Sequence, residues 1–148
     1  MIRDLVESEA GWAAPVAGFD VIEVNFSGAI YVTANGKRAE DEKQAPSTTI
    51  TLGGAFGLVD RTGVDHKLSA EDPWETLTPL FSLRHDTIES AIADRNGWLV
   101  VKFASGAMLE AGPDGGYENW QISGPGGILI VGLPSGGEPA VWRAVKED

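Results

Sequence analysis

The last third of the chain reads Gly115-Gly-Tyr-Glu-Asn-Trp-Gln-Ile122, then Gly124-Pro-Gly-Gly-Ile-Leu-Ile-Val131, and then Ser135-Gly-Gly-Glu-Pro-Ala-Val-Trp142. Three short apolar runs are separated here by glycine-rich turns. Glycine and proline mark turns, and short runs rich in β-branched and aromatic residues indicate strands. This stretch therefore predicts three consecutive antiparallel strands, which form a β-meander.

A similar pattern occurs upstream, so the chain is predicted to contain two β-meanders. The first occupies residues 19–60 and the second occupies residues 86–145. Apolar and polar residues alternate in both segments, and the dipeptides Ser27-Gly28 and Asn96-Gly97 are typical of tight hairpin turns. Because the two segments resemble each other, we expect them to contribute similar groups of strands to one fold.

Two further segments lie outside the meanders. Residues 69–82 predict a short helix, since Ser69 is a preferred cap and apolar residues recur at helical spacing, with Pro79 as a possible kink. Residues 1–18 predict an N-terminal arm or a short helix. The predicted fold is a single domain of mainly β (α+β) class over residues 1–148. Its two β-meanders form a strongly curved antiparallel sheet or half-open barrel with one short covering helix.

Composition excludes several functional classes. The chain has 148 residues with 22 acidic and 11 basic side chains, and its net charge is −11. The basic residues are scattered, which argues against nucleic-acid binding, because phosphate backbones are held by clustered Lys and Arg. No apolar run is long enough to cross a bilayer. The absence of cysteine and of a recognisable secretory signal leads us to expect a cytoplasmic protein.

The motifs of common catalytic and cofactor sites are missing. The chain contains no Gly-x-Ser-x-Gly elbow, no phosphate-binding Gly-x-x-x-x-Gly-Lys and no His-Glu-x-x-His. Its two histidines, His66 and His85, each lie beside an aspartate, but a metal site or a general base requires such groups to converge in space. We therefore expect no cofactor, no metal site and no enzymatic activity, and the roles of the two histidines stay open.

Acidic and aromatic side chains provide the candidate binding residues. Tyr117 and Glu118 are adjacent, and an acid beside an aromatic ring suits Arg or Lys through charge and cation–π contact. Glu118 could instead pair with a neighbour such as Lys102 or Arg143. Charged residues at positions 40–42 form a second acidic patch. The predicted partner-binding residues are Tyr117, Glu118, Glu138, Glu40, Asp41 and Glu42.

Two tryptophans near these residues are assigned to the core. Trp120 and Trp142 lie in predicted strands, and aromatic side chains contribute mainly through buried area. On a strand that starts at Tyr117, Glu118 and Trp120 would share one face. We therefore expect both tryptophans to support the acidic residues from below.

Short motifs along the chain indicate a resemblance to a known family. They are Tyr117-Glu118-x-Trp120, Gly124-Pro-Gly-Gly127, Gly136-Gly137-Glu138 with Trp142, Gly97-x-Leu99-x-Val101-x-Phe103-x-x-Gly106 and Leu77-x-Pro79-Leu80. With these motifs, residues 19–143 resemble an uncharacterised bacterial family of small acidic proteins that carry a Tyr-Glu-x-Trp and a Gly-Gly-Glu tail. In size, acidity and lack of catalytic motifs, its members are similar in type to immunity proteins that neutralise polymorphic toxins.

Three functional hypotheses follow. The first is a non-catalytic protein-binding module, such as an immunity-like inhibitor, which binds a basic toxin or another cationic partner. The second is a small-ligand-binding protein or a hydrolase that uses a cleft in the curved sheet. The third is a structural homodimer formed through an exposed strand edge.

Overall fold

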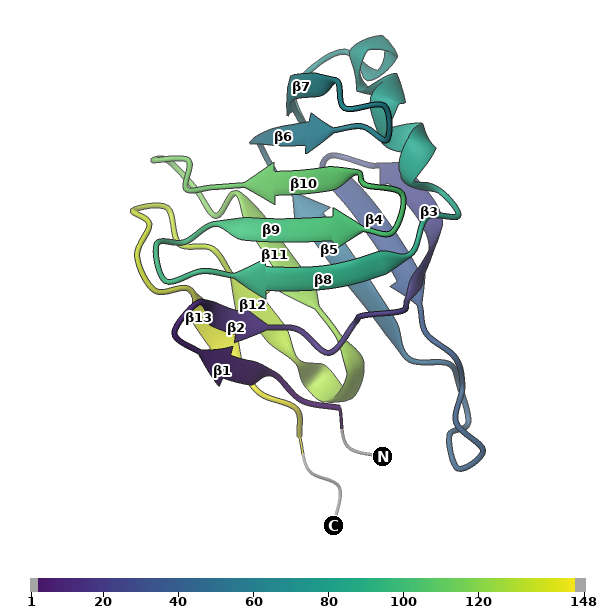
Figure 1. Cartoon of the computed structure of the whole chain (residues 1–148). Helices are drawn as coiled ribbons and strands as arrows, with labels where there is room; N and C mark the ends of the chain where they lie inside the picture. Colours follow the sequence, from purple (N-terminus) through teal and green to yellow (C-terminus); the bar gives the residue numbers. More distant parts are fainter. Residues whose placement is uncertain (1–2, 146–148) are drawn as a thin grey trace.

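The computed structural model describes residues 3–145, which fold into two antiparallel β-sheets (Figure 1). The seven-stranded sheet has the order β1-β2-β8-β9-β10-β6-β7, and the six-stranded sheet has the order β13-β12-β11-β5-β4-β3. The seven-stranded sheet contains β1 (Val6–Ser8), β2 (Gly11–Ala13), β8 (Ile88–Ala93), β9 (Leu99–Phe103), β10 (Met108–Ala111), β6 (Ala55–Val59) and β7 (Asp65–Ser69). The six-stranded sheet contains β13 (Ala140–Trp142), β12 (Leu129–Val131), β11 (Trp120–Ser123), β5 (Ser47–Leu52), β4 (Ile30–Asn35) and β3 (Asp20–Phe26).

The two sheets form two layers, one in front of the other in Figure 1. Alternate residues of the central strands point between the layers, as the period of two in a strand requires. Val101 and Leu109 from one sheet and Ile50 and Ile122 from the other are almost completely buried and belong to one hydrophobic cluster. The burial of apolar area between the sheets is therefore the main stabilising contribution to the fold.

Within residues 3–145 the chain passes from one sheet to the other three times, first from β2 to β3. It leaves the six-stranded sheet after β5, turns at Gly53-Gly54 and enters the seven-stranded sheet as β6. After β10 it returns through residues 112–119 to β11. The prediction of a mainly β fold with one helix is confirmed. The strands form two antiparallel sheets, and one helix is longer than a single turn. The finer prediction of a single curved sheet or half-open barrel is not confirmed, because each predicted meander is divided between two open sheets.

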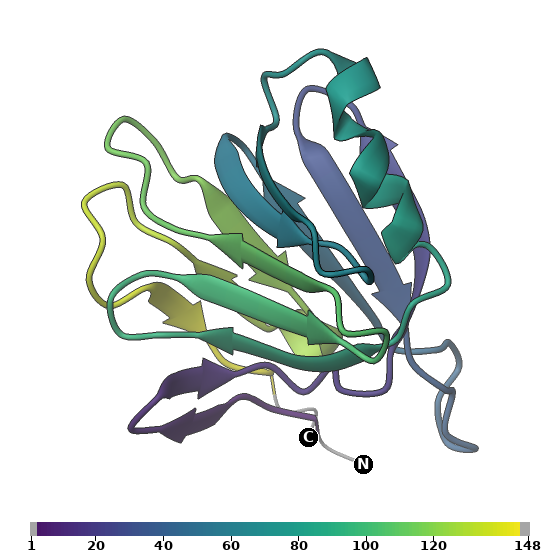
Figure 2. The same cartoon turned by 45° about the horizontal axis from the view of Figure 1, so that its top comes forward.

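The helix is a 3₁₀-helix, η1 (Trp74–Leu83), which begins later than the predicted residues 69–82. Ser69 ends β7, and its backbone N–H donates to Asp72 Oδ2 at 2.9 Å, so the intervening residues form a turn. The buried residues of η1 are Leu77, Leu80 and Leu83, whose spacing of three matches the 3₁₀ repeat. The helix packs against β3 and β7 and covers this side of the two layers (Figure 2). A second, three-residue 3₁₀ turn is η2 (Pro125–Gly127).

The N-terminal segment forms a hairpin, and not the short helix that was one prediction for residues 1–18. β1 and β2 pair with each other, and β2 extends the sheet beside β8. At Gly11 the backbone adopts φ +126°, and a side chain there would overlap Ala93 O, so only glycine permits this approach. Residues 1 and 2 lie outside the described residues.

The start of the described chain is bound to the final strand. Asp4 Oδ1 accepts a hydrogen bond from Ala144 N at 3.0 Å, and Arg143 Nη2 donates to Leu5 O at 2.9 Å. These contacts hold β13 near β1 at the side opposite η1 (Figure 1). Within residues 3–145, no helix has the length and apolar character needed to span a membrane.

Candidate functional site

Tyr117 lies in the loop between β10 and β11 and is 39% exposed. Its hydroxyl donates a hydrogen bond to Asp114 Oδ2 at 3.2 Å. Partial desolvation raises the pKa of the Tyr117 hydroxyl, and the carboxylates of Asp114 and Glu71 raise it further. Two negative charges therefore act on the tyrosine ring, one from its own loop and one from the turn before η1.

Two of the carboxylates near this tyrosine act on its hydroxyl, and a third is next to it in the chain. Glu118 follows it in the chain and is exposed. Within the described part of the chain, Glu71, Asp114 and Glu118 take part in no ion pair. The alternative pairing of Glu118 with Lys102 or Arg143 is not present. We name Glu71, Asp114, Tyr117 and Glu118 the acidic patch.

Glu138 lies at the same end of the molecule but is already paired. Its Oε1 accepts a hydrogen bond from Arg95 Nη1 at 2.9 Å, and Arg95 also contacts Glu7 at 3.1 Å. The loop that carries Glu138 touches the Tyr117 loop, since a side chain at Gly136 would lie 3.0 Å from Pro113. The structure thus brings the two loops together while the charge of Glu138 is offset by Arg95.

The second predicted patch is placed elsewhere. Glu40, Asp41 and Glu42 lie in the loop between β4 and β5, far from the Tyr117 loop in Figure 1. Glu42 Oε2 accepts a hydrogen bond from Arg3 Nη1 at 2.6 Å, and this contact lowers the pKa of Glu42. Residues 40–42 and the acidic patch are therefore separate surfaces.

The two tryptophans assigned to the core have different positions. Trp120 is 1% exposed, and its Nε1 donates to Gly97 O at 2.9 Å, which confirms the core prediction. Trp142 is 53% exposed, so the prediction that it lies in the core is wrong. In β13 the middle residue, Val141, pairs with the buried Ile130. Trp142 is displaced by one residue and therefore faces outward. Because β11 begins at Trp120, Glu118 lies in the preceding loop and not on the tryptophan's strand face.

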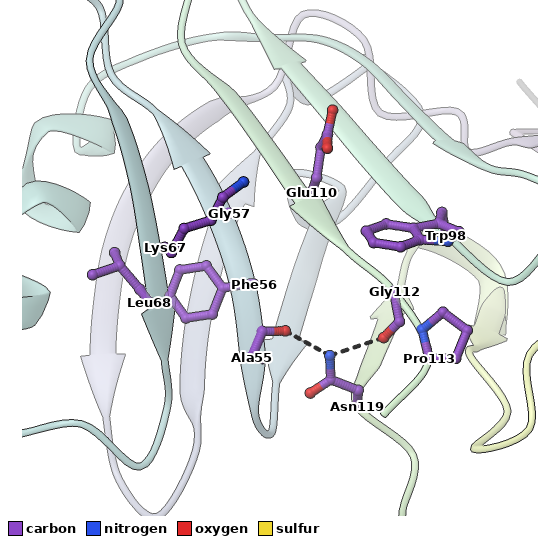
Figure 3. A pocket seen from close by; sticks show the side chains of 10 residues that line it. All are labelled: Ala55, Phe56, Gly57, Lys67, Leu68, Trp98, Glu110, Gly112, Pro113 and Asn119. Atoms are coloured by element: carbon purple, nitrogen blue, oxygen red, sulfur yellow. Dashed lines mark hydrogen bonds between the residues drawn. The ribbon is translucent and has the colours of Figure 1, made fainter. Parts of the chain in front are cut away.

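A groove of about 270 Å³ adjoins the acidic patch (Figure 3). It is lined by Ala55, Phe56, Gly57, Lys67, Leu68, Trp98, Glu110, Gly112, Pro113 and Asn119. In the sheet register Gly57 lies between Lys67 of β7 and Glu110 of β10 on the outward side. Because Gly57 has no side chain, the outer face of the sheet is hollowed at this point.

Trp98 and Pro113 form one wall of the groove (Figure 3). A side chain at Gly112 would lie 2.6 Å from the Trp98 ring, so the indole rests directly on the glycine backbone. Trp98 is nevertheless 43% exposed, which leaves part of its ring open to a ligand. Large exposed apolar surface beside polar groups is typical of contact sites.

Asn119 joins the groove to the acidic patch. This side chain is 3% exposed, and its Nδ2 donates to Ala55 O at 2.7 Å and to Gly112 O at 2.9 Å. Its Oδ1 has no hydrogen-bond partner within residues 3–145. A side chain at Gly54 would lie within 3 Å of Tyr117 Oη, Asn119 Oδ1 and Asp114 Oδ2. Gly54 therefore allows the three oxygens to meet over the turn that leads into the groove.

The groove was not predicted from the sequence. Its lining comes from β6, β7, the end of β10 and the loops around Trp98 and Asn119, so no local pattern brings these residues together. One signal was available, namely the isolated Gly57 in an otherwise apolar strand, since such a glycine marks a close approach or an open surface.

The two histidines do not form a common site. His66 Nε2 lies 2.9 Å from Asp60 Oδ2, whereas His85 is exposed after η1 and has φ 72°. In the described part of the chain, no group of three His, Cys, Asp or Glu residues could hold a metal ion. His66 thus has a local role as a partner of Asp60.

The hydrogen bonds of Asp60 lead us to expect that the protein loses stability in acid. Hydrogen bonds from Thr62, His66 and the Val64 backbone hold the pKa of Asp60 well below its ordinary value of 3.8. Because the folded-state pKa is lowered, this contribution to stability is complete above the ordinary value and is lost as the pH falls below it. Asp60→Asn should lower the urea midpoint at neutral pH and make it less sensitive to acid. Asp65→Asn, in an exposed pair with Lys67, is the control and should change little. Equal acid sensitivity in all three proteins would contradict the assignment.

Comparison with known proteins gives a family and nothing further. No curated protein and no solved structure matches the chain. One family model matches residues 12–143, which include the acidic patch, the groove and nearly all of both sheets. The prediction of an uncharacterised family is confirmed at that level. The chain belongs to the family of unknown function DUF6188.

Proposed function

We propose that the chain is a non-catalytic protein-binding module for a basic partner, which contacts the acidic patch and inserts a side chain into the groove. One observation carries this proposal: beside an apolar groove, the carboxylates of Asp114 and Glu71 act on the part-exposed Tyr117, and the exposed Glu118 follows it in the chain. None of the three carboxylates forms an ion pair within residues 3–145. Such an arrangement offers charge to a Lys or Arg and an apolar contact to a neighbouring side chain.

Charge alone would give a weak complex. Exposed ion pairs contribute about 0–1 kcal/mol each, so three carboxylates supply at most about 3 kcal/mol. The net charge of −11 acts over a longer distance and accelerates the encounter with a cationic protein. We therefore assign the rate and the selectivity of binding to the acidic patch and to the overall field.

The groove would supply most of the affinity. Its volume of about 270 Å³ accommodates one or two side chains, and Phe56, Trp98 and Pro113 provide apolar walls. Residues buried in such a pocket at the centre of an interface commonly contribute about 2 kcal/mol or more each. An apolar anchor next to Lys or Arg in the partner would engage both parts of the surface.

The other predicted contact residues would have smaller roles. Glu138 is paired with Arg95, and Glu42 is paired with Arg3, so a partner must compete with these contacts. Glu40 and Asp41 lie in the same loop as Glu42, away from the groove. We assign these residues to the general negative field, while Tyr117 and Glu118 make direct contacts.

An immunity-like inhibitor is the specific form of this function that we favour. A small acidic protein in the cytoplasm could cover the basic active or binding surface of a toxin in this way. The acidity of the chain and the position of its unpaired carboxylates support this form.

The groove also supports a second candidate, a small-ligand-binding protein. Ligand pockets usually have volumes of about 300–1,000 Å³ and enclose most of their ligand. The groove, at about 270 Å³, is slightly smaller and lies on the outer face of a sheet. It suits a protruding side chain better than an enclosed metabolite.

Charge reversal at the acidic patch tests the proposal. A partner captured from host lysate at low salt would be identified by mass spectrometry, and its Kd would be measured by calorimetry. Glu118→Lys should weaken binding by about tenfold or more and reduce its salt dependence. Gly57→Val should weaken binding to a similar extent with little change in salt dependence, because it fills the groove.

Glu40→Lys is the matched control, since it makes the same change of charge in the loop between β4 and β5. It should reduce the association rate slightly and leave the dissociation rate unchanged. Equal losses for Glu118→Lys and Glu40→Lys would remove the acidic patch from the proposal. A partner that binds Gly57→Val as tightly as the wild type would remove the groove.

A further inference from the structure

Five neighbouring strands of the six-stranded sheet contain no charged residue. β4, β5, β11, β12 and β13 include no Asp, Glu, Lys, Arg or His, although 22% of the chain is charged. The strands are adjacent in the sheet. Their outward side chains therefore form one continuous uncharged surface, which we name the neutral face.

The register defines the composition of the neutral face. The inward residues Val32, Ile50, Ile122 and Ile130 are buried and lie opposite one another, so the residues on either side of each point outward. One outward row consists of Thr33, Thr49, Ser123, Leu129 and Trp142. The next row consists of Tyr31, Thr51, Gln121, Val131 and Ala140, of which Val131 is only 7% exposed and so adds little to the accessible surface. The face changes from hydroxyl groups at β4 to apolar groups at β13.

The neutral face lies on the opposite side of the molecule from the groove. The groove is on the seven-stranded sheet, where Lys67 and Glu110 face outward, and the two sheets are separate layers in both views (Figures 1 and 2). The outward side of the seven-stranded sheet also carries Lys102 and Asp65. The distribution of charge thus differs between the two sides of the fold.

Charge decides which partner suits the neutral face. A basic protein would gain no electrostatic attraction from it. A second copy of this chain has the same net charge of −11, so two copies repel each other where their acidic surfaces meet. This repulsion is weakest where the facing surfaces contain no charge. We propose that two copies of the chain associate through their neutral faces, with Trp142 and Leu129 as the apolar part of a twofold-symmetric contact.

The dimensions of the neutral face indicate a weak dimer. The five strands have between three and six residues each. With strands spaced by about 4.8 Å, they cover roughly 24 Å by 15 Å, or about 360 Å² for each copy. Stable interfaces bury about 800 Å² on each side. Association should therefore depend on concentration in the micromolar range or above, and both grooves would stay accessible in the dimer.

Sedimentation equilibrium of the purified chain tests this inference. The dimer should increase with protein concentration up to about 500 µM, and it should increase when salt is raised from about 50 to about 500 mM, because salt screens the repulsion. Gln121→Glu places a charge at the centre of each neutral face and should weaken association by about tenfold or more. Gln44→Glu makes the same chemical change in the exposed loop between β4 and β5 and should have little effect.

A monomer at all these concentrations and salts would overturn the inference. Equal effects of Gln121→Glu and Gln44→Glu would place the contact elsewhere on the chain and overturn it as well. A dimer that dissociates when salt is added would indicate a charged interface and would also overturn the inference. Thermal unfolding of both variants checks that the fold is unchanged. Gln121 is part-exposed and Glu has nearly the same shape, so we expect Gln121→Glu to fold like the wild type. The inference does not depend on the acidic patch, because neither substitution alters it.

Discussion

Trp120→Ala is expected to lower the free energy of unfolding by about 3–5 kcal/mol, which is a large part of the stability of a small domain. The indole is buried between the sheets and donates to Gly97 O. Gly132 fits closely against the ring, since a side chain there would lie 2.3 Å from it. Neighbouring atoms therefore cannot fill the cavity without moving backbone, and the carbonyl of Gly97 loses its donor. Urea unfolding followed by circular dichroism measures the effect.

Trp142→Ala provides a matched control, because it makes the same chemical change at a side chain that is 53% exposed. Its expected cost is below about 1 kcal/mol. Gly132→Ala tests the same packing from the opposite side and should also be strongly destabilising. Similar losses in the two tryptophan variants would mean that the sheets do not pack around Trp120 as described.

Asn119→Asp is expected to cost about 3–5 kcal/mol near neutral pH, because it places a carboxylate at a site that is only 3% exposed. Asn119 Nδ2 donates to the carbonyls of Ala55 and Gly112, and an aspartate would oppose both with an acceptor. Asn119→Ala leaves these carbonyls without a donor but adds no charge, so its loss should be smaller. Unfolding in urea, measured for both variants at several pH values, separates the two effects.

The loss in Asn119→Asp should decrease as the pH falls towards about 4, because protonation removes the buried charge. The loss in Asn119→Ala should show no such difference from wild type. Asn96→Asp is the control, since Asn96 occupies an exposed turn in which Asp-Gly is also favourable. An Asn119→Asp protein as stable as the Asn96→Asp protein would show that the bridge between the loop and the seven-stranded sheet is unimportant.

Local patterns in the sequence predicted the strands and several of their turns. Gly28 and Gly97 adopt positive φ values, of 79° and 90°, at the turns that their dipeptides predicted. These features are determined by residues that are close together in the chain, which is why a single sequence contains them.

The division into two sheets could not be predicted in the same way. Alternation shows which side of a strand is buried but not which strand lies beside it. β5 and β6 are separated by only Gly53-Gly54, yet they belong to different sheets. The N-terminal hairpin was missed because its strands have three residues each, which is too short to establish a period.

Local sequence patterns also account for only part of the candidate site, because they do not show contacts between distant residues. Tyr117 and Glu118 are exposed, as expected of contact residues, while Glu138 and Glu42 have arginine partners that lie far away in the sequence. Trp142 was misplaced because a three-residue strand at an edge gives little indication of its inward side. The groove depends on five separated segments and on a missing side chain at Gly57, so only the folded chain contains it.

The passage of the chain between sheets has a consequence for its synthesis. β5 ends at Leu52, and its partner β11 begins only at Trp120. A ribosome that adds about 5–20 residues per second needs roughly 3–13 s to make the residues between them. During that time the threonine-rich edge of β5 is open to strands of other nascent chains. Slower translation of the second half of the chain would therefore be expected to increase aggregation.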